Sequence, residues 1–86
     1  MKLTIEDKKI LADIGVSDRD FPQIERAMTK TDYKYNSRKI SRDKAVELVG
    51  RRNYLSGLSR SAFHWTAVRE TATGECVYFD SHKLFM

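Results

Sequence analysis

The sequence predicts a small α+β domain in which three to four short helices precede a C-terminal antiparallel β-hairpin. Apolar residues recur at helical spacing through the first two thirds of the chain, and after His64 they alternate at the two-residue period of strands. The chain has 86 residues, of which 41% are hydrophobic and 33% charged. Such a chain can bury one modest core. We therefore expect residues 1–86 to form a single globular domain.

Capping residues predict the first two helices. Thr4, with Asp7 three positions later, forms a capping box, and Gly15 is placed to end this helix. The second helix is expected to begin near Asp20, because Pro22 is tolerated in a first turn but breaks a hydrogen bond farther in. Its expected buried side consists of Phe21, Ile24, Ala27 and Met28.

A third helix is predicted from its cap at Ser41 to its end at Gly50. Residues 51–63 keep helical spacing, but Gly57 has no side chain to support a helix. We expect this glycine to divide the stretch into two short turns.

The hairpin is the best-supported element of the prediction. Residues 64–70 and 75–80 are rich in aromatic and β-branched residues, and Gly74 suits the turn between them. Val68, Val77 and Phe79 are expected on the buried face, with Trp65 and Tyr78 near the other. Tryptophan at a helix-to-strand junction is most often part of a core, so burial is expected for Trp65. The alternative is that Trp65 anchors a binding interface, where tryptophan is favoured.

A lone hairpin is marginally stable in water and needs a further partner. Tyr33 and Tyr35 are spaced for one face of a strand, so residues 33–35 are expected to complete a three-stranded sheet. Otherwise an uncovered sheet edge could pair with a second copy of the chain and form a homodimer.

Positive charge is concentrated in the middle of the chain. The net charge is +4, and residues 34–60 carry eight basic and two acidic side chains, a local net charge of +6. Such a block attracts phosphates or acidic protein surfaces. Arginine binds phosphate through two parallel hydrogen bonds, and nearby hydroxyl groups can add others. The expected binding residues are Arg38, Lys39, Arg42, Arg51, Arg52, Tyr54 and Arg60.

Composition and motifs disfavour other classes of function. Ser61, His64 and Asp80 are the residue types of a hydrolase triad, but no nucleophile-elbow motif is present. The single cysteine, Cys76, and the two histidines match no zinc-binding spacing. No apolar run is long enough to span a membrane. We expect a cytoplasmic protein without enzyme activity, catalytic residues, metal or cofactor.

The run from Ile40 to Phe85 resembles small uncharacterised proteins of bacterial and mobile-element genomes. The resemblance lies in residues 40–45, 54–58 and 60–67. It implies no particular activity or site residues. It does imply a context in which compact regulators, such as anti-CRISPR and antirestriction proteins, inhibit host machinery and are usually not enzymes.

Two functions are therefore expected. The first is a non-enzymatic protein that contacts nucleic-acid phosphates through a basic face in residues 34–60. The alternative is an inhibitor or adaptor that uses the same face to bind an acidic surface on a nucleic-acid-processing enzyme.

Overall fold

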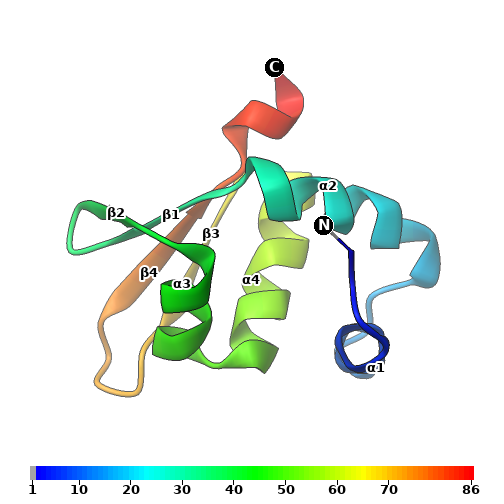
Figure 1. The fold of residues 1–86 in the computed structure, drawn as a ribbon, viewed down its shortest axis with the longest axis horizontal. Coiled ribbons are helices and arrows are strands. Elements are labelled where there is room, and N and C mark those ends of the chain that lie inside the picture. Colours follow the sequence, from blue (N-terminus) through cyan, green and yellow to red (C-terminus); the bar gives the residue numbers. More distant parts are fainter. Residues whose placement is uncertain (1) are drawn as a thin grey trace.

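The structure, a computed structural model, describes residues 2–86 and confirms the α+β class (Figure 1). Helices lie on one side of a four-stranded antiparallel sheet, and one hydrophobic cluster joins the two layers. The helices are α1 (Ile5–Asp13), α2 (Phe21–Lys30), α3 (Arg42–Val49) and α4 (Arg51–His64), with short 3-10 turns η1 (Asp18–Asp20) and η2 (His82–Phe85). The strands are β1 (Asp32–Tyr35), β2 (Arg38–Ile40), β3 (Thr66–Glu70) and β4 (Cys76–Asp80).

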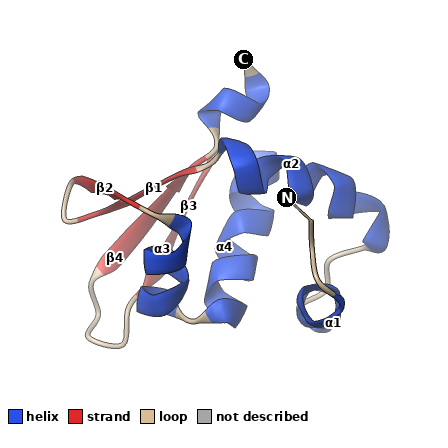
Figure 2. Ribbon diagram, viewed as in Figure 1, coloured by secondary structure: helices blue, strands red, loops and turns tan. Residues whose placement is uncertain are grey.

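The sheet has the strand order β2-β1-β4-β3 and contains one strand more than expected (Figure 2). The β3–β4 hairpin is confirmed, and residues 33–35 form part of the third strand, in which Tyr33 pairs with Phe79. The additional strand, β2, follows a tight turn at Asn36 and Ser37, whose φ angles are 52° and 64°. This hairpin was not expected from the sequence because Asn-Ser is a weaker turn signal than Asn-Gly.

One hairpin residue, Val68, lies on the face of the sheet opposite to the one predicted. Ala67 lies opposite Phe79 and both are buried, whereas Val68 lies opposite Tyr78 and is 40% exposed. Directly opposed residues of an antiparallel pair share a face. The expectation that Val68 is buried was therefore wrong, and the smaller Ala67 faces the helices instead.

Trp65 is also not a core residue. Its side chain is 50% exposed and lies against the rings of His82 and Phe85 in η2. Its φ of 72° is in the left-handed region, which turns the chain out of α4 and into β3. Trp65 therefore precedes β3, and the alternation of inward and outward side chains begins only at Thr66.

The expected break at Gly57 does not occur, because α4 is one continuous helix of 14 residues. A Cβ atom at position 57 would lie 2.7 Å from Cζ of Phe79, which is closer than real Cβ contacts. The glycine therefore allows α4 to approach the sheet. Packing of the apolar face of α4 against the sheet outweighs the low helix propensity of one glycine, about 1 kcal/mol.

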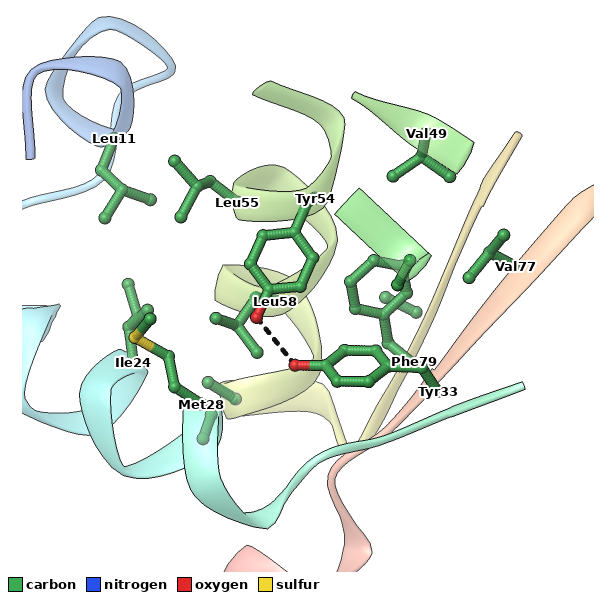
Figure 3. Close-up of a cluster of buried hydrophobic side chains, with 14 of the residues drawn as sticks. Leu11, Ile24, Met28, Tyr33, Val49, Tyr54, Leu55, Leu58, Val77 and Phe79 are labelled. Carbon is green, nitrogen blue, oxygen red and sulfur yellow. Dashed lines mark hydrogen bonds between the residues drawn. The ribbon is translucent and has the colours of Figure 1, made fainter. Parts of the chain in front are cut away.

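Three aromatic rings fill the space where α4 meets the sheet (Figure 3). The centroid of Phe79 lies 5.4 Å from that of Tyr33 and 5.9 Å from that of Tyr54. The two tyrosine hydroxyl groups hydrogen-bond to each other at 2.8 Å, so neither polar group is buried without a partner.

We predict that Gly57→Ala destabilises the protein by about 1–3 kcal/mol, because the added methyl group would overpack the Phe79 ring. At an exposed helix position the same change stabilises by roughly 1 kcal/mol. Chemical denaturation measures the difference. The double variant Gly57→Ala/Phe79→Leu should show a non-additive effect, whereas a stabilised Gly57→Ala protein would contradict the close contact.

We also predict that Phe79→Ala lowers the free energy of unfolding by about 3–5 kcal/mol, because the ring is fully buried. Thermal melting provides the measurement, and Tyr78→Ala on the opposite face of the same strand is the control. Similar melting temperatures for the two variants would contradict the observed orientation of β4.

Candidate functional site

Three of the expected binding residues, at the start of α4, are engaged within the fold. Tyr54 is 3% exposed, so its side chain belongs to the core and not to a binding surface. Arg51 Nε donates a hydrogen bond to Asp7 Oδ1 at 2.7 Å, and Arg52 Nη1 lies 2.6 Å from Asp13 Oδ2. Both arginines thus connect α4 to α1.

Arg42 and Arg51 meet at a hollow of about 270 Å³ beneath the N-terminal segment. Each has a carboxylate near its guanidinium group: Asp7 for Arg51, and Asp43 at 3.7 Å for Arg42. These carboxylates offset the positive charge of the hollow and reduce its attraction for phosphate.

The remaining residues of the expected basic face are separated from this hollow. Arg38 and Lys39 lie on β2, where Lys39 Nζ is 3.2 Å from Asp32 Oδ1. Arg60 lies near the other end of α4. The sequence block of positive charge therefore does not form one continuous face.

Arg60 borders a groove of about 400 Å³ between α4, β3 and the connection from α1 to α2. Arg69 from β3 and His64 from the end of α4 line the same groove, together with Ser56. Asp20 is its one acidic lining residue. Arg69 was not among the expected binding residues because it lies outside the basic block at residues 34–60. Arg69 is two positions after Ala67, and residues two apart on a strand share a face. The side chain of Arg69 therefore lies on the helix-facing side of β3 with Ala67, and this spacing was the signal available in the sequence.

Internal hydrogen bonds hold the Arg69 guanidinium group in place. Nε and Nη2 donate to Ser56 Oγ at 3.3 and 2.8 Å, and Nη1 donates to the Val68 carbonyl oxygen at 2.7 Å. Neither Arg69 nor Arg60 forms an ion pair with a carboxylate within residues 2–86. The groove thus presents two arginines whose charge no carboxylate contact neutralises.

The residues considered for a hydrolase triad or a metal site form contacts that stabilise the fold. Ser61 is buried and accepts a hydrogen bond from Ser81 at 2.8 Å, while Asp80 Oδ1 lies 3.3 Å from His82 Nδ1. In the described part of the chain, no group of three or more His, Cys, Asp or Glu side chains could hold a metal ion. Over the same residues, no helix has the length and apolar character needed to cross a membrane.

Comparison of the chain with protein-family models, curated proteins and solved structures gives no match. We therefore infer function from the geometry and charge of the groove and of the sheet.

Asp7 is the buried carboxylate on which the α1–α4 contact depends. Its side chain is 1% exposed, and burial by itself raises the pKa of this carboxyl group. Hydrogen bonds from Arg51 and from the backbone N–H of Thr4, together with the charge of Arg51, outweigh burial and lower the pKa overall. A carboxylate with a lowered pKa stabilises the fold at pH values above its unfolded pKa.

We predict that Asp7→Asn costs about 1.5–3 kcal/mol at neutral pH, because it removes the charged partner of Arg51. The difference from the native protein should shrink as pH falls through the lowered pKa, since protonation removes the same charge from Asp7. Urea unfolding over a range of acidic to neutral pH tests this. The control is Asp13→Asn, whose exposed pair with Arg52 should contribute about 1 kcal/mol or less. An equal loss of unfolding free energy in both variants would contradict the conclusion that the α1–α4 contact depends on Asp7.

Proposed function

We propose that the protein is a non-enzymatic nucleic-acid-binding protein that contacts backbone phosphates through the groove between α4 and β3. The observation that carries this proposal is the convergence of Arg60 and Arg69 in one groove without carboxylate partners. Paired arginines with uncompensated charge are suited to bind a phosphate diester.

Arg69 contributes preorganisation to this interaction. Because its guanidinium group is already held by Ser56 and the Val68 carbonyl, it loses less side-chain entropy when a ligand binds. The Ser56 hydroxyl group accepts from Arg69 and retains its own proton, which can be donated to a phosphate oxygen. Arg60 is exposed and can adjust to the ligand, while His64 supplies a further ring N–H.

Phosphate contacts of this kind supply affinity and position without reading the base sequence. Binding should therefore be similar for different sequences and should weaken as salt concentration increases. A groove with two arginines can neutralise about two phosphates, so the salt dependence should be shallow compared with that of proteins with many phosphate contacts.

We predict that Arg60→Ala weakens binding to nucleic acid at low salt and reduces the slope of log K against log salt concentration by about 1. Fluorescence anisotropy of a labelled oligonucleotide provides the measurement. The matched control is Arg52→Ala, which removes the same side chain from the same helix where Asp13 already pairs with it. Unchanged binding by Arg60→Ala, or no binding by the native protein, would refute the proposal.

In the alternative function, an inhibitor or adaptor, the same two arginines bind carboxylates on the surface of an acidic protein. It predicts that the purified native protein does not bind oligonucleotides at low salt. Phosphate is the preferred ligand because two guanidinium groups in one small groove suit its several oxygens.

A further inference from the structure

One side of the sheet faces away from α1–α4 (Figure 1). Pairing in register places a row of side chains from all four strands on this side. In register, Lys39 pairs with Lys34, Lys34 with Tyr78, and Tyr78 with Val68. The alternate residues of these strands point into the core. We refer to this row, together with Trp65 and the neighbouring η2 side chains, as the outer face.

Exposed aromatic side chains lie on the outer face and beside it. Tyr78, in a central strand, is 52% exposed, and Trp65 is half exposed where β3 begins. Trp65 is steadied by His82 and Phe85, whose ring centroids lie 4.9 and 5.9 Å away. Aromatic rings held by a rigid sheet can stack with nucleobases at little cost in conformational entropy.

Lysines surround these rings. Lys39 Nζ and Lys83 Nζ each lie 3.2 Å from a different oxygen of Asp32, so two ammonium groups share one carboxylate. Lys34 lies directly opposite Lys39 and forms no ion pair within residues 2–86. Like charges directly opposed on a sheet repel each other, and a bound anion would relieve this repulsion. Asp80 lies directly opposite Asp32 in register, so around Asp32 the three lysines exceed the two carboxylates by one charge.

Two further carboxylates belong to the outer face, and one of them, Asp80, lies directly opposite Asp32 in register. Asp80 accepts hydrogen bonds from the backbone N–H of His82 and lies 3.3 Å from its ring Nδ1. Glu70 is at the opposite end of β3, where it pairs with Cys76 in register. The charge complementary to phosphate is therefore concentrated over β1, β2 and η2, next to Tyr78.

We propose that the outer face binds single-stranded nucleic acid, with bases stacked on Tyr78 and Trp65 and phosphates at Lys34, Lys39 and Lys83. A duplex cannot occupy it in this way because its bases are already stacked on one another. This inference rests on the proposed function and specifies the form of the nucleic acid.

The outer face and the groove are adjacent across the edge strand β3. Val68 belongs to the outer face, and its carbonyl oxygen accepts the hydrogen bond from Arg69 Nη1 in the groove. A flexible single strand can therefore cross this edge, with phosphates near Arg69 and bases on the sheet. The same hydrogen bond occupies a carbonyl group of β3, which opposes the addition of another strand there.

The test compares a labelled oligothymidylate with a DNA duplex of the same length, using the full chain. We expect the native protein to bind the single strand more tightly. Tyr78→Ala should weaken that binding about 5- to 150-fold, the effect of one stacked base, with a smaller change for duplex. Tyr78→Phe keeps the ring and should bind like the native protein, and thermal melting checks that both variants are folded.

Lys34→Ala gives a second test that leaves the aromatic rings in place. It should reduce the slope of log K against log salt concentration for the single strand by about 0.7. Equal binding of Tyr78→Ala and native protein to oligothymidylate, while Arg60→Ala still weakens binding, would overturn this inference and leave the proposed function intact. No binding of either oligonucleotide would overturn both.

One further outcome would assign the outer face to a different occupant. If sedimentation shows a native dimer that Tyr78→Ala converts to a monomer, a second copy of the chain covers the face and the inference is overturned. A monomeric native protein that binds oligothymidylate through Tyr78 supports it.

Discussion

The close approach of α4 to β4 at Gly57 and Phe79 is the contact on which the rest of the structure depends. The missing side chain at position 57 leaves space for the Phe79 ring, which then packs between Tyr33 and Tyr54. α4 thereby packs closely against the inner face of the sheet, which α3 also contacts. A substantial part of the small core is formed at this junction, and α1–α4 all lie on the other side of the sheet from the outer face.

The same helix organises both surfaces to which we assign function. Its first turn is connected to α1 by Arg51 and Asp7, and its second half presents Arg60 to the groove. At its end, the left-handed residue Trp65 redirects the chain into β3. This change of direction places Arg69 on the groove side of the sheet and Val68 on the outer face. The groove and the outer face are therefore two sides of one edge strand.

The distribution of positive charge follows from the periodicity of the elements that carry it. Arg51 and Arg60 are nine positions apart, and at about 100° per residue they point to nearly opposite sides of α4. Arg51 consequently meets α1, and Arg60 meets the groove. On β2, Arg38 and Lys39 point to opposite faces for the same reason. Positive charge that is contiguous in sequence is thus divided among several surfaces, and carboxylates from other elements neutralise part of it.

The sequence by itself determined the fold class, the capping of α1 and α3 and the terminal hairpin, because these depend on hydrogen bonds and apolar spacing between near neighbours. Thr4, Ser41 and Gly50 act locally, as predicted. The tertiary structure alone decided that Gly57 lies within a continuous helix, that Val68 and Trp65 are exposed, and that Tyr54 is buried. It also brought Arg69 to Arg60. Each of these outcomes depends on which distant element packs against a residue, and local spacing carries no information about that partner.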